Sequence, residues 1–131
     1  MATILVVDDS RLSRGILADV LKDAGYDVIE AVDGKQALAV YEARRPDCVV
    51  SDLLMPVMGG REFLRRLRES GADVPVIIAS ADIQQASCSE CEALGISGFL
   101  NKPVSSQQLV ESVSLALSQT AQSPSQQGVA S

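Results

Sequence analysis

Short runs of consecutive apolar residues alternate along the chain with longer segments in which apolar residues recur every three or four positions. The short runs are typical of strands buried on both faces of a parallel sheet, and the longer segments are typical of amphipathic helices. The pattern predicts five strands, at Thr3–Val7, Asp27–Ala31, Asp47–Asp52, Val74–Ser80 and Gly98–Asn101. It predicts five helices, at Ser10–Ala24, Asp33–Arg45, Arg61–Ser70, Asp82–Leu94 and Ser105–Leu117.

This strict alternation of strands and helices predicts an α/β fold. Each segment between two strands is long enough for a crossover that joins parallel strands, and such crossovers are almost always right-handed. We therefore expect a doubly wound, five-stranded parallel sheet with helices on both faces. Ligands of such sheets bind at the carboxyl ends of the strands, which is where candidate chemistry is sought.

The last segment, Ser118–Ser131, has no charged residue and is rich in Ser and Gln. A segment of this composition buries too little apolar surface to fold by itself. With 131 residues the chain has room for one domain of ordinary size. We expect residues 1–117 to form that domain and residues 118–131 to be a disordered tail or a linker.

Composition and charge exclude several classes of function. The formal net charge is −6, which argues against a nucleic-acid partner because nothing offsets repulsion from phosphates. The chain has no histidine, so catalysis by a histidine base and histidine metal sites are excluded. Three cysteines, an odd number, argue against a disulfide framework. The N-terminus lacks a signal-peptide pattern and the apolar runs are too short to cross a bilayer, so we expect a cytoplasmic protein without membrane contact.

Polar residues end four of the predicted strands. Asp8 and Asp9 follow the first, Asp52 ends the third, Ser80 ends the fourth and Lys102 follows the fifth. Three carboxylates at one sheet edge repel one another, and a hard divalent cation such as Mg²⁺ relieves that repulsion. A cation and a lysine beside a carboxylate suit phosphoryl transfer, with an aspartate as nucleophile.

The chain resembles the receiver domain of two-component response regulators, and in particular single-domain chemotaxis regulators, over about residues 3–117. The segments that carry the resemblance are ILVVDDS at 4–10, SDLLMPVMGG at 51–60, VPVIIASA at 74–81 and GFLNKPV at 98–104. It implies a flavodoxin-like (βα)5 fold with strand order 2-1-3-4-5 and a receiver domain over residues 1–117.

The resemblance also implies roles for particular residues. Asp52 matches the phosphoacceptor; Asp8, Asp9, Asp52 and the backbone carbonyl of Leu54 match the ligands of Mg²⁺ or Mn²⁺. Lys102 matches the lysine that pairs with the phosphoryl group, and its bond to Pro103 is expected to be cis.

The resemblance further implies a switch and its partners. Phosphorylation of Asp52 by a sensor histidine kinase or a histidine phosphotransfer protein draws Ser80 inward, and Phe99 moves into the vacated space. The face made by the fourth helix, the fifth strand and the fifth helix then binds a downstream protein; dimerisation on phosphorylation stays open. Weak self-phosphorylation from small phosphodonors and autodephosphorylation are expected, rather than enzymatic activity in the usual sense. Arg11, Arg14 and Val104 match positions that face the kinase.

Some positions depart from the commonest pattern of the family, among them Phe99, which stands in place of a tyrosine. Gly59 stands where an aspartate is frequent, and Leu54 cannot hydrogen-bond an attacking water, whereas Asp82 could order one. Leu54 and Asp82 are expected to affect the attack of water on the phosphoryl group in opposite directions. The sequence therefore does not predict how long the phosphoryl group stays on Asp52. Cys88 and Cys91 form a C-x-x-C motif inside the expected fourth helix, where we interpret them as two small helix residues.

Other functions remain as alternatives. The chain could be a receiver module of a larger multidomain regulator or hybrid kinase, or a pseudo-receiver that binds partners without phosphorylation. An aspartate-nucleophile phosphatase would need an acid at Leu54, and a flavodoxin-like cofactor site would place a flavin phosphate against Asp8 and Asp9, which would repel it.

Overall fold

A computed structural model of the chain describes residues 2–81 and 91–130, and a single parallel sheet forms the centre of this part. The strands are β1 (Thr3–Val7), β2 (Asp27–Ala31), β3 (Cys48–Ser51), β4 (Val76–Ser80) and β5 (Gly98–Asn101). They lie in the order β2-β1-β3-β4-β5, and every pairing is parallel. The expected fold class and strand order are therefore confirmed.

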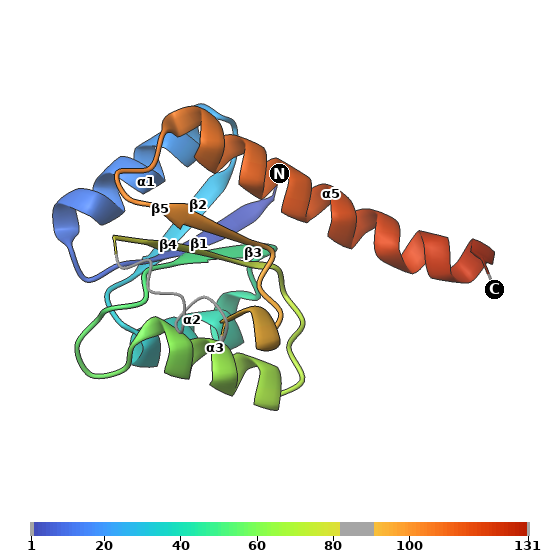
Figure 1. Cartoon of the computed structure of the whole chain (residues 1–131), viewed down its shortest axis with the longest axis horizontal. Helices are drawn as coiled ribbons and strands as arrows, with labels where there is room; N and C mark the ends of the chain where they lie inside the picture. The colour runs from blue at the N-terminus through green and yellow to red at the C-terminus, as the bar shows by residue number, and fades with distance from the viewer. Residues whose placement is uncertain (1, 82–90, 131) are drawn as a thin grey trace.

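Helices cover both faces of the sheet (Figure 1). The helices of the described part are α1 (Arg11–Asp23), α2 (Gly34–Arg44), α3 (Gly60–Glu69) and α5 (Ser106–Ala130). Helices α1 and α5 pack on one face, and α2 and α3 pack on the other. Of the helix expected over Asp82–Leu94, residues 82–90 lie outside the described residues, and residues 91–93 are helical.

The alternation of side chains along β1 explains why the sheet needs two helical layers. Leu5 and Val7 belong to the apolar cluster on the side of α2 and α3, whereas Ile4 and Val6 belong to the cluster on the side of α1 and α5. All four side chains are completely buried. Because successive residues of a strand point to opposite faces, a strand that is apolar throughout must be covered on both.

Side-chain caps begin three of the helices. Ser10 accepts a hydrogen bond from the backbone N–H of Ser13, and Asp33 accepts one from Gln36. Ser105 accepts one from Gln108 at the start of α5. Such caps satisfy backbone donors that have no partner within the helix.

Helix α5 continues to Ala130, past the end that the sequence pattern predicts at Leu117. Figure 1 shows its last part extending away from the sheet. Adding residues to an existing helix needs no new nucleus, so a segment that buries too little apolar surface to fold by itself can still continue one. The division into a domain over residues 1–117 and a tail over 118–131 stays a prediction. Among the described residues, no helix is both long enough and apolar enough to span a bilayer.

The loop between β3 and α3 folds tightly against the end of β3. The backbone N–H of Gly60 donates to the carbonyl of Leu53 at 2.8 Å. A Cβ atom on Gly60 would lie 2.1 Å from the carbonyl oxygen of Asp52, which is far inside van der Waals contact. Only glycine fits where α3 begins, and this close approach fixes the helix beside the residue that ends β3.

We expect Gly60→Ala to lower the free energy of unfolding by about 3 kcal/mol, because the added methyl group must push two backbone segments apart. Gly15→Ala in α1 is the matched control, since nothing lies within 4 Å of a Cβ at Gly15. The control should be more stable than the unaltered protein by about 0.5–1 kcal/mol. Urea unfolding followed by circular dichroism measures both, and equal stability of Gly60→Ala and the unaltered chain would contradict the expectation.

Candidate functional site

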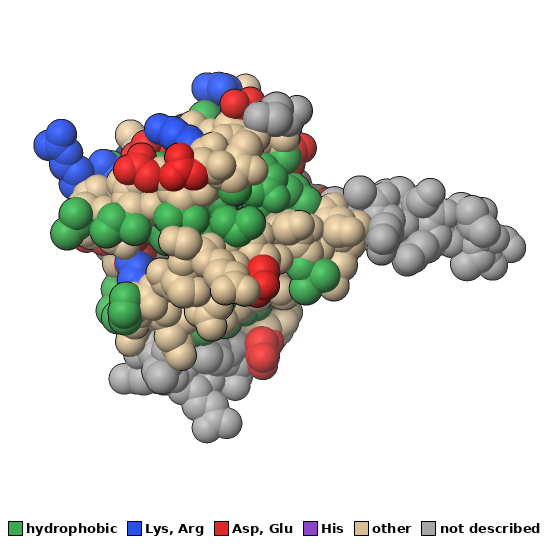
Figure 2. Space-filling model, turned by 90° about the horizontal axis from the view of Figure 1, so that it is seen from above, with side chains coloured by type: hydrophobic (Ala, Val, Ile, Leu, Met, Phe, Trp, Pro, Cys, Tyr) green, Lys and Arg blue, Asp and Glu red, His purple; other side chains and the backbone are tan. Residues whose placement is uncertain are grey.

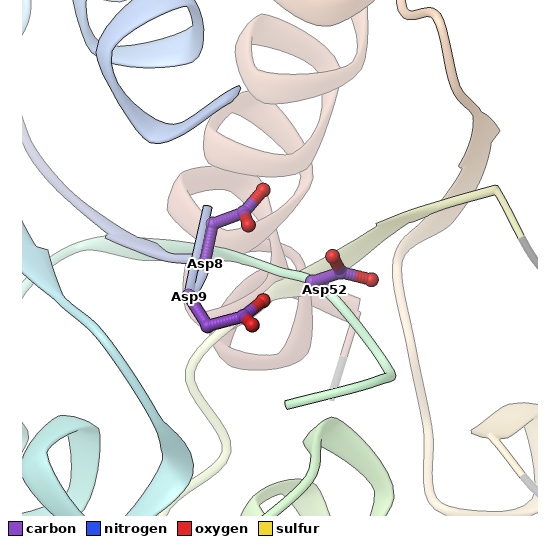
Figure 3. Close-up of side chains that lie close together, drawn as sticks. All are labelled: Asp8, Asp9 and Asp52. Atoms are coloured by element: carbon purple, nitrogen blue, oxygen red, sulfur yellow. The ribbon is translucent and has the colours of Figure 1, made fainter. Parts of the chain in front are cut away.

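Three carboxylates meet at the carboxyl edge of the sheet, where β1 and β3 end side by side. Val7 and Ser51 are paired in the ladder, so Asp8 and Asp52 leave the sheet from adjacent positions. One carboxylate oxygen each of Asp8, Asp9 and Asp52 lies within 4.8 Å of the others. Figure 3 shows Asp8 and Asp9 at the end of β1 and Asp52 at the end of β3. The sequence prediction that these three acids converge is thus met by the geometry.

The three acids differ in exposure. Asp8 is completely buried, Asp52 is half-buried and Asp9 is exposed. The backbone N–H of Asp8 donates to the carbonyl of Ala31 on β2, and its Oδ1 accepts from the N–H of Ser10 at 2.9 Å. The cluster therefore has a fixed, buried inner side and an open outer side from which a ligand can approach.

Asp52 is held by the chain on both sides of it. Its N–H donates to the carbonyl of Val7 at 2.9 Å, which continues the ladder between β1 and β3. Its Oδ1 accepts from the N–H of Leu53 at 2.7 Å. One carboxylate oxygen is thus directed by the backbone, and the other, Oδ2, is left to meet groups from other strands.

Lys102 supplies the positive charge of the cluster. Its Nζ lies 2.6 Å from Oδ2 of Asp8 and 3.0 Å from Oδ2 of Asp52. Burial alone would lower the pKa of Lys102, but the hydrogen bonds and charges of Asp8 and Asp52 outweigh it and raise that pKa above its usual value. The expected cis bond between Lys102 and Pro103 is confirmed.

The other predicted site residues lie around this cluster. Ser80 is buried at the end of β4, and its carbonyl accepts from the N–H of Lys102. Phe99 lies on β5 opposite Ile78 and packs, partly buried, against the apolar cluster on the side of α2 and α3. The side chain of Leu54 is exposed. Asp82 and Cys88 lie outside the described residues, and Cys91 is buried.

One contact to the cluster, made by Arg14, was not predicted from the sequence. The family resemblance placed Arg14 only on the surface that faces the kinase. The Nη1 of Arg14 donates to the backbone carbonyl of Asp8 at 2.9 Å, and its Nε donates to Glu30 on β2 at 2.9 Å. The sequence contained one indication of this contact. A positive side chain near the start of a helix interacts unfavourably with the helix dipole, so an arginine there is expected to have a partner outside the helix.

An apolar groove of about 400 Å³ opens beside Lys102, between α1 and the loop after β5. Its lining residues are Ser10, Leu12, Ser13, Ile16, Leu17, Ala81, Lys102, Pro103 and Val104. Leu12 is 75% exposed and Ile16 is 52% exposed, although both follow the apolar period of α1. Figure 2, which views the molecule from above Figure 1, shows hydrophobic side chains at the surface of this face. The groove therefore places an apolar surface beside Lys102, which contacts two acids of the cluster.

The donor set of the cluster fits a hard divalent cation. The three acids present oxygen ligands only, which Mg²⁺ prefers, and one of them is buried and oriented by the backbone. Lys102 already neutralises part of the charge on two of them. The third acid, Asp9, is exposed, and a cation that keeps several of its waters can bind the cluster from that side.

A parallel sheet of this strand order, with three acids and a lysine at its carboxyl edge, defines a class of doubly wound α/β domains whose ligands bind at that edge. Comparison with protein families makes the class specific: the family model for the response regulator receiver domain matches residues 4–114. The chain belongs to this family, the receiver domains of two-component response regulators.

Individual relatives agree with this assignment. The chemotaxis protein CheY of Thermotoga maritima is 33% identical over 111 residues, which cover 84% of this chain and 92% of that protein. The phosphate regulon transcriptional regulatory protein PhoB of Pseudomonas aeruginosa is 34% identical over 120 residues, which cover 90% of this chain and 52% of PhoB. A solved structure of the chemotaxis protein CheY4 of Vibrio cholerae, crystallised at low pH, has a TM-score of 0.83 and 35% identity, covering 88% of this chain and 98% of that one.

We expect Lys102→Met to lower the free energy of unfolding by about 1–3 kcal/mol in the presence of EDTA, because it leaves the buried Asp8 beside two further carboxylates without a cation. Added Mg²⁺ should recover part of this loss. The matched control is Lys35→Met, which removes an exposed lysine from α2 and should change stability little. Urea unfolding with EDTA and with Mg²⁺ measures both variants, and equal behaviour of the two would contradict the expectation.

Proposed function

We propose that this protein is a phosphorylation-activated signalling switch in which Asp52 accepts a phosphoryl group from a histidine kinase or a histidine phosphotransfer protein. The observation that carries the proposal is the position of the Asp52 carboxylate, beside Asp8 and Asp9 and hydrogen-bonded to Lys102, in a chain of the receiver family. Asp52 is the half-buried member of the cluster, so it is oriented and still accessible to a donor.

In this proposal Asp8, Asp9, Asp52 and the backbone carbonyl of Leu54 hold Mg²⁺ or Mn²⁺. When bound, the cation withdraws charge from the phosphoryl oxygens and so lowers the repulsion that a carboxylate nucleophile meets. Asp8 gives the site its fixed side, because its carboxylate is buried and held by Ser10 and Lys102. Asp9 is the exposed ligand that completes the site from the solvent side.

The transfer itself exchanges one bond to phosphorus for another. An oxygen of Asp52 forms a bond to phosphorus as the bond between phosphorus and the donor's imidazole nitrogen breaks, and the imidazole keeps the electron pair. In this proposal Lys102 pairs with a phosphoryl oxygen. Its contacts with Asp8 and Asp52 support this role, because they hold its ammonium group beside the Asp52 carboxylate. Small phosphodonors serve the same reaction, and water later removes the phosphoryl group.

The switch in this proposal passes from Ser80 to Phe99. The hydroxyl of Ser80 turns toward the phosphoryl group, and the ring of Phe99 moves into the space that is freed. Phe99 is partly buried and lacks a hydroxyl group, so the signal depends on ring packing alone. The face made by the helix expected over Asp82–Leu94, β5 and α5 then binds a downstream protein, in the manner of a bistable packing element.

The groove beside Lys102 supports docking of the phosphoryl donor at α1. Leu12, Ile16 and Val104 give it an apolar surface next to the acidic cluster. An amphipathic donor helix that lays its apolar face there would bring its phosphohistidine to the exposed side of Asp52. Arg11 and Arg14 lie on the same helix.

Two further parts of the proposal concern where the domain acts and whether it is joined to other segments. We infer that it acts in the cytoplasm, without nucleic acid or membrane as a direct partner, and that residues 118–131 form a tail or a linker to another segment. A receiver module of a larger regulator is supported by the match to half of PhoB. A phosphorylation-independent pseudo-receiver is disfavoured by the complete set of Asp8, Asp9, Asp52, Ser80 and Lys102.

Incubation with acetyl phosphate and Mg²⁺ should add one phosphoryl group to the protein, because the donor, the cation and the acceptor complete the reaction without a kinase. Intact mass and Phos-tag mobility measure the adduct. Asp52→Asn and EDTA are the controls, and both should abolish it. Absence of the adduct from the folded, unaltered protein would overturn phosphorylation from small donors and favour a pseudo-receiver.

We expect Ile16→Asp to slow phosphoryl transfer from a donor protein by about tenfold or more, because it places a charge in the apolar groove. The phosphohistidine domains of the source organism are first purified and compared as donors to the unaltered chain. The domain that phosphorylates it fastest is then used as the donor. Transfer from acetyl phosphate should stay unchanged, which separates docking from chemistry. Leu115→Asp is the matched control: Leu115 is 59% exposed on α5 and does not line the groove. Equal transfer rates for the two variants would contradict docking at this groove.

A further inference from the structure

Arg14 has a position that the energetics of its own helix do not explain. It lies near the start of α1, where the helix dipole disfavours a positive side chain, and the first turn contains no acidic residue to compensate. Its side chain is nevertheless only 16% exposed. The reason for a largely buried arginine at this position must therefore lie in its partners outside α1.

Those partners connect β2 with the turn between β1 and α1. The Nε of Arg14 donates to Oε1 of Glu30 on β2, and Nη1 donates to the carbonyl oxygen of Asp8, both at 2.9 Å. The guanidinium group is planar and rigid, so the direction of Nη1 is fixed once Nε is held by Glu30. The position of Glu30 on β2 therefore determines, through Arg14, the direction in which the carbonyl group of Asp8 is held.

That carbonyl group belongs to the peptide plane between Asp8 and Asp9. The other polar atoms of Asp8 are already held: its N–H by Ala31, Oδ1 by Ser10 and Oδ2 by Lys102. Rotation of the Asp8–Asp9 peptide plane would leave these contacts largely in place and would change the direction in which Asp9 leaves the backbone. Asp9 is the exposed acid, for which burial provides no other restraint.

We propose that Arg14, held by Glu30, is a positioning residue that sets the affinity of the acidic cluster for a divalent cation by fixing the peptide plane between Asp8 and Asp9. This inference rests on the cation site of the proposed function and adds a residue that does not touch the cation. Groups that orient metal ligands in this way typically change metal affinity 10- to 100-fold when they are removed.

Simple electrostatics predicts the opposite sign. A guanidinium group near three carboxylates repels an incoming cation, so removal of its charge should tighten cation binding. Loss of a positioning contact should instead weaken binding. The direction of the change therefore separates the two roles of Arg14.

The experiment measures Mn²⁺ affinity by isothermal titration calorimetry and by the electron paramagnetic resonance signal of free Mn²⁺. Arg14→Gln should bind Mn²⁺ about tenfold more weakly than the unaltered protein. The matched control is Arg11→Gln, which removes the same charge from an exposed residue in the same helical turn and should bind Mn²⁺ equally or slightly more tightly. Binding by Arg14→Gln that equals or exceeds that of the unaltered protein would overturn the proposal.

Arg14→Lys provides a second variant that keeps the charge. Lysine has a single ammonium group in place of the planar fork, so it cannot hold Glu30 and the carbonyl of Asp8 in the same geometry. Weaker Mn²⁺ binding by this variant supports positioning, and unchanged binding overturns it. If Arg14→Gln does not fold, as judged by circular dichroism, Arg14→Lys decides alone.

The unaltered protein and Asp8→Asn separate this inference from the proposed function. Failure of the unaltered protein to bind Mn²⁺ would overturn the cation site itself, and the role of Arg14 with it. Binding by the unaltered protein that is lost in Asp8→Asn but unchanged in both Arg14 variants would overturn only the role of Arg14.

Discussion

A completely buried carboxylate must have its charge balanced, and the structure around Asp8 is arranged to meet that requirement. Burying an ion costs several kcal/mol unless it is paired and hydrogen-bonded. Asp8 receives a backbone N–H from Ser10 and the ammonium group of Lys102, which also contacts Asp52. Three strands and the turn after β1 must therefore keep their places for the site to exist. Because the same ammonium group serves two carboxylates, a change at any of the three residues alters the other two.

The sequence was sufficient to predict the fold and the convergence of the four charged residues. The fold prediction depends on the alternation of strands and helices, and the strand order depends on the resemblance to receiver domains. The predicted convergence depends on the rule that parallel strands bring their carboxyl ends to a common edge. Residues 8, 52 and 102 each directly follow the last residue of a strand. Their meeting therefore follows from the strand order and does not require knowledge of individual contacts. The roles of these residues in phosphorylation depend on the family and on experiment.

Other features could not be predicted because they depend on the relative placement of elements. Leu12 and Ile16 fit the apolar period of α1, but only the position of the loop after β5 determines that they are exposed. Arg68 lies in the last turn of α3, and its guanidinium donates to the carbonyls of Ala72, Leu94 and Gly95. Periodicity assigns such a residue to a helix face without showing its partners. The end of α5 was missed for a different reason, since burial and helix propagation are separate requirements.

Asp8 and Asp52 are bonded to the sheet through their backbone N–H groups, whereas their carbonyl groups face neighbouring loops and helices. Their N–H groups bond to Ala31 and Val7, as in a ladder, whereas their carbonyls meet Arg14 and the start of α3. The separation of the two side chains is therefore inherited from the spacing of the strands, which tolerates little variation. Their surroundings come from loops, which accept substitution far more readily. Substitutions in these loops can thus change the surroundings of the two carboxylates while the distance between the carboxylates stays constant.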